Sequence, residues 1–580
     1  MRNVEIAQIL SEISELLLMD GVAFKPRAYE RAAEAIAGSE EEMTSIYERG
    51  GLKDLEDVPG VGVSIAEKIE ESLKTGRIKY YEELKKKFPV NLLELSKIEG
   101  LGPKTIQLLY KKLGVKDLVG LEKAVKSGKV RNLPGFGAKS EEKILKSIEV
   151  YHRHSGRFLI GDVGYIAETI KSRLVALPYV STAEIAGSFR REKETVGDLD
   201  ILVISTKPKE VMDVFVSQPE VAQIIARGDA KSSIKLESGL NVDMRVVSAE
   251  SYGAALAYFT GSKAHNVAMR EIAQKKGWKL NEYGLYRKGH GNDKWIYIAG
   301  KTEEDIYKKL GLEYVEPEMR EDAGELDLAK SGKLPRLIGY GDLMGDLQVQ
   351  SNWTDGENSI EELALYSYKL GYKYIAITDH TKHLAMTHGL DPARLLKQGA
   401  EIDKLNKKLK GKITILKGTE CDILKDGTLD LPDSALSKLD VVGVSIHSYF
   451  NLPRKEQTER LERAMRNPYV HIVFHPTGRL ITRREPCDLD MDRIIKVAKE
   501  TGTVLEIDAL PDRLDLKDEY IKKAVEAGVK LAIDSDAHAL NHFSFLRYGI
   551  AQARRGWAKK SDIINAWPLD KMKSFLKNSK

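Results

Sequence analysis

The stretch GSFRREKETVGDLDILV, Gly187–Val203, joins a glycine-serine turn to a strand in which polar and apolar residues alternate. Side chains on a strand point to opposite faces in turn, so Asp198 and Asp200 share one face and apolar residues take the other. The later stretch LNVDMRVV, Leu240–Val247, alternates in the same way and puts Asp243 on its polar face. On neighbouring strands these three carboxylates would repel one another, and the usual compensation is a divalent cation. The pattern predicts an α/β unit for in-line phosphoryl transfer with two metal ions.

The turn before this strand suits a triphosphate. Gly187 and Ser188 offer backbone amides and a hydroxyl, and Arg191 adds positive charge. Any one of the aspartates alone is equally well interpreted as a solvated surface residue. The turn, the two aspartates of the first strand and a later strand aspartate together favour the metal site.

The composition bounds the class of protein. The chain has 580 residues, of which 42% are hydrophobic and 31% charged, so we expect three or more folded units. We find no long apolar run and no signal peptide, so we expect a cytoplasmic protein with no membrane partner. Two cysteines, Cys421 and Cys487, are too few for a disulfide framework. The net charge of +4 is only a weak indication of a polyanionic partner.

One pattern occurs three times in the first 150 residues, which otherwise have helical periodicity. Each copy is an apolar residue, a Gly-x-Gly turn and a helix, and the glycine pairs are Gly60 and Gly62, Gly100 and Gly102, and Gly135 and Gly137. Amides of such a turn and of the following helix N-terminus bind a phosphodiester backbone without reading bases. One copy alone could be a plain turn between helices. Three copies favour DNA, and they resemble helix-hairpin-helix motifs of DNA repair proteins.

With YFTGSKAHNVAMR, Tyr258–Arg270, the strand motifs resemble a family X DNA polymerase of the polymerase beta kind, over about residues 1–318. The resemblance implies that Asp198, Asp200 and Asp243 hold Mg²⁺ or Mn²⁺, and that Asp243 also accepts the proton of the primer 3′-hydroxyl. It assigns no role to His265. The nucleotide-binding positions that it implies are Gly187, Ser188, Arg191, Tyr258, Phe259, Gly261, Asn266 and Arg270.

The same resemblance extends to the N-terminal helices. Lys68 matches the lysine that attacks the sugar of a 5′-deoxyribose phosphate, and Tyr29 matches a DNA-binding residue beside it. A lysine amine can form a Schiff base with the ring-opened aldehyde, after which β-elimination follows. A solvated lysine on an amphipathic helix is the alternative, and Ser64 stands where the family has a second basic residue.

From residue 340 on, short apolar strands alternate with amphipathic helices, which predicts a parallel sheet closed into a barrel. Histidines and carboxylates follow the carboxyl ends of several strands, where barrels carry their sites. The region resembles a PHP domain, a metal-dependent phosphoesterase fold, and implies two or three Mn²⁺ or Zn²⁺ ions. Gln348 and Gln350 stand where the family has His-x-His, so we expect one cation position to be weakened. The ligand positions that match are Asp355, His380, Glu420, His447, His475, Asp536 and His538.

The expected architecture is multidomain, α+β and α/β, and ends in a distorted (β/α)7 barrel. We expect a helical lyase-like DNA-binding domain at 1–82, a helix-hairpin-helix fingers-type domain at 83–153, a nucleotidyltransferase palm at 154–249, a thumb for nucleotide selection at 250–318, a charged linker at 319–336 and the PHP domain at 337–580.

The function that these resemblances imply is a DNA-directed DNA polymerase that fills short gaps in base excision repair. The PHP domain would add 3′–5′ exonuclease or AP-endonuclease activity, or both, and Lys68 lyase activity. The expected partners are gapped or nicked DNA and deoxynucleoside triphosphates, and we expect a monomer. Three alternatives stay open: a nucleotidyltransferase with another acceptor, a polymerase whose PHP domain is structural, and a non-catalytic DNA-end-binding scaffold.

Overall fold

The computed structural model describes residues 3–22, 24–37, 39, 41–153, 156–289 and 294–578. Contacts divide the chain into two compact units. The first comprises Met1–Ser155 with Thr482–Glu485, and the second comprises Gly156–Ile481 with Pro486–Lys580. Among the described helices, none has both the length and the apolar character needed to cross a membrane.

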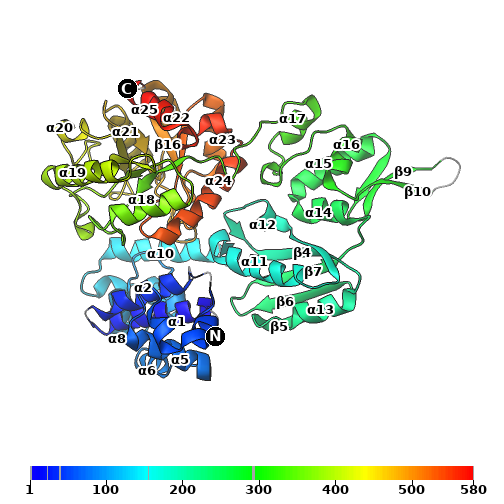
Figure 1. Cartoon of the computed structure of the whole chain (residues 1–580), viewed down its shortest axis with the longest axis horizontal. Helices are drawn as coiled ribbons and strands as arrows, with labels where there is room; N and C mark the ends of the chain where they lie inside the picture. The colour runs from blue at the N-terminus through cyan, green and yellow to red at the C-terminus, as the bar shows by residue number, and fades with distance from the viewer. Residues whose placement is uncertain are drawn as a thin grey trace. The chain divides into compact units, whose positions relative to one another are not determined.

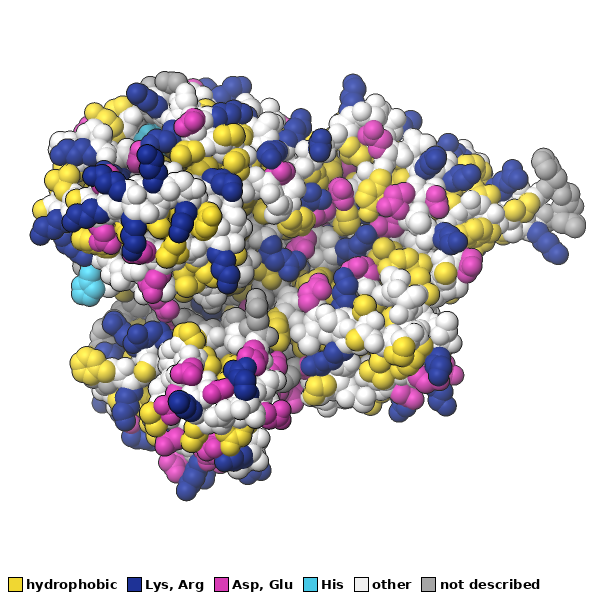
Figure 2. All heavy atoms as spheres, in the orientation of Figure 1, with side chains coloured by type: hydrophobic (Ala, Val, Ile, Leu, Met, Phe, Trp, Pro, Cys, Tyr) yellow, Lys and Arg dark blue, Asp and Glu magenta, His cyan; other side chains and the backbone are white. Residues whose placement is uncertain are grey.

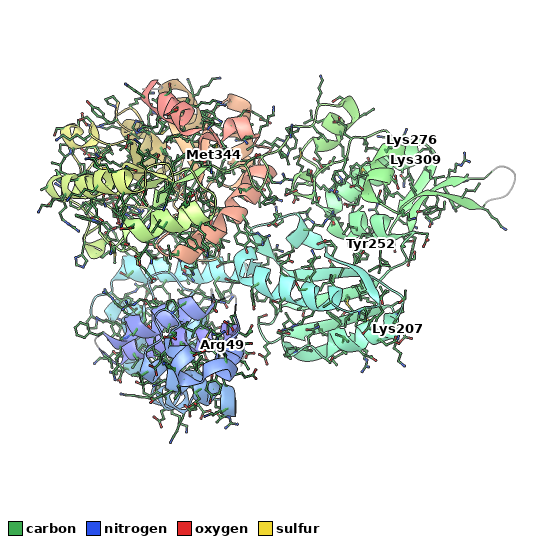
Figure 3. All side chains as sticks on the ribbon, viewed as in Figure 1. Arg49, Lys207, Tyr252, Lys276, Lys309 and Met344 are labelled. Atoms are coloured by element: carbon green, nitrogen blue, oxygen red, sulfur yellow. The ribbon has the colours of Figure 1, made fainter. Side chains whose placement is uncertain are left out.

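The first unit is helical, as its apolar periodicity predicts. In the first helix Ile6, Leu10, Ile13 and Leu17 recur on one face and are buried in the core. At the surface, Arg49 pairs with Asp54 at 2.9 Å (Figure 3). The elements are α1 (Asn3–Met19), α2 (Lys25–Ala37), α3 (Met43–Gly50), α4 (Leu52–Glu56), α5 (Val63–Thr75), α6 (Lys79–Lys87), α7 (Leu92–Leu95), α8 (Pro103–Leu113), α9 (Leu118–Lys126), η1 (Val130–Asn132) and α10 (Ala138–Arg153).

The second unit begins with the palm, whose five-stranded sheet lies within residues 156–289 and has the order β2-β4-β7-β6-β5. Strands β4 and β7 are parallel neighbours, while the other pairs are antiparallel. Its strands are β2 (Val180–Ile185), β4 (Asp198–Ser205), β5 (Val221–Arg227), β6 (Lys231–Leu236) and β7 (Asn241–Val246), and the short pair β1 (Phe158–Leu159) and β3 (Thr195–Val196) lies beside them. Its helices are α11 (Ile160–Val175), α12 (Gly187–Arg190) and α13 (Pro208–Val216).

The thumb follows the palm and begins with α14, whose first residue Tyr252 is labelled in Figure 3. A three-stranded antiparallel sheet, β10-β9-β8, packs beside its helices (Figure 1). The elements are α14 (Tyr252–Thr260), α15 (Lys263–Lys275), β8 (Trp278–Asn281), β9 (Gly284–Lys288), β10 (Trp295–Ala299) and α16 (Glu303–Leu310).

The prediction of a charged linker is wrong. Residues 319–336 begin at the last residue of η2 (Pro317–Met319) and contain α17 (Glu325–Ser331), and Met319, Leu326 and Ala329 are buried in the thumb core. The segment shows no apolar period because its helical elements are short and because some of its buried side chains are charged. Arg320 and Glu325 are both 0% exposed.

Arg320 anchors this segment to the thumb. Its Nη1 donates to Glu303 Oε1 at 2.6 Å and its Nε to the Val315 carbonyl at 2.9 Å. Although burial opposes it, Arg320 and Arg190 hold the pKa of Glu303 at about 2.

Replacing Arg320 with methionine leaves the buried Glu303 charge with one guanidinium fewer. Since breaking a buried pair costs about 3–5 kcal/mol, we expect amide hydrogen exchange in α16 to accelerate accordingly, while Lys330→Met on the exposed face leaves exchange unchanged.

The C-terminal region forms a seven-stranded parallel sheet, within residues 294–578, in the order β11 to β17. The last strand returns beside the first, where Gln350 N donates to the Ala537 carbonyl at 2.8 Å and Leu347 N to Asp534 Oδ1 at 2.7 Å. The predicted barrel is therefore confirmed as a nearly closed sheet. Its strands are β11 (Gly345–Val349), β12 (Tyr374–Ile377), β13 (Thr414–Asp422), β14 (Val441–Ser445), β15 (Ile472–Val473), β16 (Val504–Asp508) and β17 (Leu531–Asp534).

Helices cover the outside of the barrel, as a parallel sheet requires. The interior of the barrel is filled by apolar side chains such as Leu347, Ala376 and Phe474, all 0% exposed. The helices are α18 (Ile360–Lys369), α19 (Pro392–Lys408), α20 (Asp433–Leu436), α21 (Arg454–Met465), α22 (Met491–Thr501), α23 (Asp518–Ala527), α24 (Leu546–Arg555) and α25 (Leu569–Asn578), with short 3₁₀ turns at η3 (Ala385–Thr387), η4 (Leu540–Phe545), η5 (Lys560–Asp562) and η6 (Ile564–Ala566).

Candidate active sites

The palm carboxylates lie together on the two parallel strands. Asp200 on β4 is in register with Asp243 on β7, and Asp198 is two residues earlier on β4, so it shares the face of Asp200. Burial, followed by repulsion from Asp198 and Asp243, raises the pKa of Asp200 to about 6. Gly187 has a positive φ of 68° and comes so close that an added Cβ would lie 3.4 Å from Asp200 Oδ2. The crowding and the raised pKa fit a site that holds divalent cations.

A basic residue that the sequence analysis did not identify contacts this triad. Lys231 on β6 places Nζ 2.9 Å from Asp243 Oδ2. Although burial opposes it, hydrogen bonds from Ser233 and Lys231 keep the pKa of Asp243 below its ordinary value. Asp243 is therefore ionised and available as a ligand at neutral pH.

The expected triphosphate residues occupy the start of the palm. Ser188 lies in α12, directly after Gly187. The guanidinium of Arg191 is 3.1 Å from Glu321 Oε1 and also donates to the Thr260 carbonyl, so in this structure it is held by the protein itself. This contact ties the turn to the end of α14.

The thumb residues expected to bind nucleotide and template gather around α14 and α15. Arg245, two residues after Asp243, places its guanidinium 4.6 Å from the ring centroid of Phe259, which connects the triad to the thumb. The Phe259 and Tyr258 rings lie edge to face at 5.2 Å, and Asn266 Nδ2 donates to the Tyr258 carbonyl at 2.7 Å. Gly261 ends α14, and Tyr258, Asn266 and Arg270 line a shallow pocket between the helices.

His265 also lines this pocket. It is 2% exposed, with Nδ1 2.7 Å from Glu325 Oε1 and Nε2 2.8 Å from the Tyr307 hydroxyl. Glu325 belongs to the segment mistaken for a linker, so this segment fixes the helix that presents Asn266 and Arg270. Sequence reasoning missed this role because both partners of His265 are distant in the chain.

The three Gly-x-Gly turns of the helical unit share one conformation. The first glycines, Gly60, Gly100 and Gly135, have φ of 80°, 85° and 83°, which favours glycine. Gly62 and Gly102 are extended and directly precede α5 and α8. Among the described residues, no atom lies within 4 Å of a Cβ added at Gly62, Gly102 or Gly137, so these turns are open to a phosphate backbone. On the face seen in Figure 2, basic and acidic side chains are interspersed over this unit.

Lys68 and Tyr29 lie together in the same unit. Lys68 Nζ donates to Ser64 Oγ at 3.0 Å and lies 5.9 and 5.1 Å from the ring centroids of Tyr29 and Tyr80. Burial lowers the pKa of Lys68 and raises that of Tyr29 to about 12. A lowered pKa favours the neutral amine that Schiff-base chemistry needs. The sequence analysis did not identify Tyr80.

In the barrel, the seven matching positions come together around Glu420, at the carboxyl ends of the strands. Glu420 is 1% exposed, and its Oε1 lies 2.8 Å from His475 Nε2 and 3.1 Å from His447 Nε2. On the other side, Asp355 Oδ2 lies 3.7 Å from both His380 Nε2 and His538 Nε2. We call these seven residues, which include Asp536, the PHP cup.

The donor set of the PHP cup fits divalent metal ions. Among the described residues, two triads have ligand atoms that all lie within 4.8 Å of one another: Asp355, His380 and His538, and His380, Glu420 and His447. Buried atoms in the cup lack a hydrogen-bond partner among the described residues, including His380 Nδ1, His475 Nδ1 and Asp536 Oδ1. Histidine nitrogens and carboxylate oxygens are the ligands of Zn²⁺ and Mn²⁺ sites.

Gln348 and Gln350 also reach the cup. Both are 0% exposed, and their Nε2 atoms donate to Glu420 Oε2 at 3.2 and 2.8 Å. The two glutamines are thus directed at the candidate metal site, with amides in place of imidazoles.

Two further charged residues border the cup and were missed. Asp422 Oδ1 lies 3.2 Å from His447 Nδ1, the arrangement in which a carboxylate orients a metal-binding histidine. Arg513 Nε lies 3.4 Å from Asp508 Oδ2 and 4.0 Å from Asp536 Oδ2. Asp422 is the last residue of β13, two residues after Glu420, so the same strand pattern could have found it, whereas Arg513 follows β16 in a loop without any pattern.

Comparison with protein families agrees with this geometry. Residues 1–78 match the family described as "Helix-hairpin-helix domain", and residues 92–149 match "SAM-like Helix-hairpin-helix tandem". Residues 161–239 match "DNA polymerase beta palm", and residues 255–321 match "DNA polymerase beta thumb".

Comparison with individual proteins extends over the whole chain. The chain is 39% identical, over 582 residues and 100% of both chains, to "DNA polymerase/3'-5' exonuclease PolX" of Bacillus subtilis (strain 168). Over 38% of its length it is 30% identical to a probable phosphatase of Thermoanaerobacter sp. (strain X514), covering 89% of that protein. Over 55% of its length it is 26% identical to DNA polymerase lambda of Rattus norvegicus, covering 56% of that protein. The chain therefore belongs to the family X DNA polymerases, in the PolX form that combines a polymerase beta-like region with a PHP phosphoesterase domain.

Proposed function

We propose that this chain is a DNA-directed DNA polymerase that fills short gaps during base excision repair. The observation that supports this most is the convergence of Asp198, Asp200 and Asp243 on the paired strands β4 and β7. These carboxylates would hold Mg²⁺ or Mn²⁺, and such ions supply charge neutralisation on phosphates and activation of the attacking hydroxyl. Asp243, kept ionised by Ser233 and Lys231, accepts the primer 3′-hydroxyl proton.

The other proposed nucleotide contacts follow from the turn and the thumb. Gly187 and Ser188 place amides and a hydroxyl beside Asp200, where a triphosphate would enter. Arg191 can leave Glu321 to bind this triphosphate. Tyr258, Phe259 and Gly261 face the sugar, while Asn266 and Arg270 reach the base pair in the minor groove.

The test of gap filling is extension on two matched DNA substrates. The helical unit with its Gly-x-Gly turns grips the 5′ side of a gap, so a one-nucleotide gap with a 5′-phosphate should be filled faster than the same primer is extended on an open template. Equal rates would leave a polymerase without a preference for gaps. Lack of extension on both substrates in Mg²⁺ and Mn²⁺ would favour the non-catalytic scaffold.

For the PHP cup we propose metal-dependent phosphodiester cleavage, as a 3′–5′ exonuclease, an AP endonuclease, or both. The convergence of histidine and carboxylate ligands around Glu420 supports this. The alternative is a structural domain, and Mn²⁺-dependent release of nucleotides from a 3′ end separates the two. The expected partners are gapped or nicked DNA and deoxynucleoside triphosphates, and we propose a cytoplasmic monomer.

We also propose 5′-deoxyribose phosphate lyase activity at Lys68. Its amine attacks C1′ of the ring-opened sugar and loses water to form a Schiff base, and β-elimination then releases the 5′-phosphate end. Reduction with borohydride should trap the protein covalently on such DNA. Lys68→Ala should abolish this cross-link, whereas Lys74→Ala, an exposed lysine of the same helix, should retain it. A cross-link that survives Lys68→Ala would assign the chemistry to another amine.

A further inference from the structure

Glu420 is the residue around which the PHP cup is built, and both of its carboxylate oxygens are engaged. Oε1 lies within 3.1 Å of the Nε2 atoms of His447 and His475. Oε2 accepts hydrogen bonds from Gln348 Nε2 at 3.2 Å and Gln350 Nε2 at 2.8 Å. Both glutamines are 0% exposed, so their amide hydrogens take the place that water or a cation would otherwise occupy beside Oε2.

An amide N–H and a metal ion compete for the same carboxylate oxygen. An N–H donates a hydrogen and has no lone pair for a cation, whereas a neutral histidine offers a nitrogen lone pair. A cation held at Oε2 from the side of β11 would therefore face two hydrogen-bond donors. If histidines occupied these two positions, they would offer the cation two ligands.

The remaining ligands account for two cation positions. Among the described residues, the two triads with metal-ligand spacing share His380, and neither includes a glutamine. The second triad contains Glu420, whose Oε2 lies 3.6 Å from His380 Nδ1 and accepts the glutamine hydrogen bonds. His475 and Asp536 belong to neither triad; His475 is hydrogen-bonded to Glu420, and Asp536 faces the guanidinium of Arg513 at 4.0 Å. Positive charge beside Asp536 is thus supplied by a side chain of the protein.

We propose that the PHP cup of this chain is built for no more than two divalent cations, with the Gln348 and Gln350 amides replacing a third. The inference rests on the proposed function of the cup as a metal-dependent phosphoesterase. Glu420 remains a ligand through Oε1 toward His447, while Oε2 is anchored to the glutamines. The hydrogen bonds keep Glu420 in its orientation without the ion that would otherwise fix it.

The opposite orientation of the glutamine amide groups is a competing arrangement, and the experiment must distinguish it from the one that we propose. Gln348 Oε1 and Gln350 Oε1 are buried without a partner among the described residues. Turning both amides over would point these oxygens at Glu420 Oε2, which is repulsive unless a cation lies between them. In that arrangement the glutamines would bind the third cation instead of replacing it.

The experiment counts bound zinc by equilibrium dialysis at a fixed nanomolar free Zn²⁺ concentration, followed by elemental analysis. The full chain carries Asp200→Asn and Asp243→Asn, so that the palm binds no zinc. We expect no more than two zinc ions per chain. Adding Gln348→His and Gln350→His should raise the count by one, and adding Gln348→Leu and Gln350→Leu should leave it unchanged.

A matched control places the same pair of histidines elsewhere. Gln223→His with Ile225→His puts them two residues apart on the exposed strand β5, where they should hold no additional zinc at this free concentration. Three zinc ions in the parent chain, or one ion fewer in the leucine variant, would overturn the inference. These outcomes are independent of cleavage: a chain that binds three ions and cuts DNA retains the proposed function, and one that binds two and cuts nothing loses only that function.

Discussion

Replacing Asp243 by alanine is expected to reduce extension on one-nucleotide-gapped DNA by at least about a thousandfold, because this carboxylate combines two tasks. It lies in register with Asp200 across the parallel strands, where it completes the cation site. We also propose it as the acceptor for the proton of the attacking hydroxyl. Removing it therefore weakens cation binding and deprotonation at the same time. Single-turnover extension with saturating DNA and nucleotide measures the effect on the chemical step.

Asp229→Ala is the matched control, since Asp229 is an exposed carboxylate of the same sheet, in the turn between β5 and β6. It should extend primers at the native rate. Asp243→Ala should also bind gapped DNA as tightly as the native protein, because the helix-hairpin-helix turns are unchanged. Extension by Asp243→Ala at the native rate would remove the palm triad from the mechanism.

The palm triad was predictable because an alternating strand carries its own register. Once β4 and β7 are read as strands, period-two geometry alone places Asp198 and Asp200 together and Asp243 on the matching face. Lys231 was missed because it is the first residue of β6, whose sequence KSSIKL has apolar residues only at Ile234 and Leu236. Nothing in so short a pattern pairs β6 with β7 or places Lys231 beside Asp243.

The PHP ligands were predictable for a different reason, namely that the carboxyl ends of parallel strands converge. This rule found Glu420 and the histidines, but it gave no means of finding Arg513, which lies in a loop whose course depends on tertiary packing. The segment 319–336 was misread because Arg320 and Glu325 are buried charges. A pattern based on hydrophobicity places such residues at the surface, although here paired partners distant in the sequence allow their burial.

The second large effect is expected at Glu420, which lies beside three histidines of the PHP cup, His380, His447 and His475. Its oxygens are shared among His447, His475 and the two glutamines, so the Glu420→Gln substitution keeps the shape while removing the charge that holds a cation. Replacing a residue that only orients a metal ligand already costs about 10–100-fold, so losing a ligand should reduce Mn²⁺-dependent release of 3′ nucleotides by at least about a hundredfold. His475→Ala removes a partner of the same carboxylate and should act in the same direction.

Polymerase activity provides the internal comparison for Glu420→Gln. The palm and the PHP cup have separate ligands, so the variant should still fill gaps at the native rate while 3′ degradation falls. Asp403→Asn, which changes an exposed carboxylate on α19, should preserve both activities. If native protein and Glu420→Gln release nucleotides equally, the cleavage does not occur in the cup. If neither releases any in Mn²⁺ or Zn²⁺, the domain is structural, and the hydrogen bonds from Gln348 and Gln350 to Glu420 then serve the stability of the barrel instead of an altered nuclease.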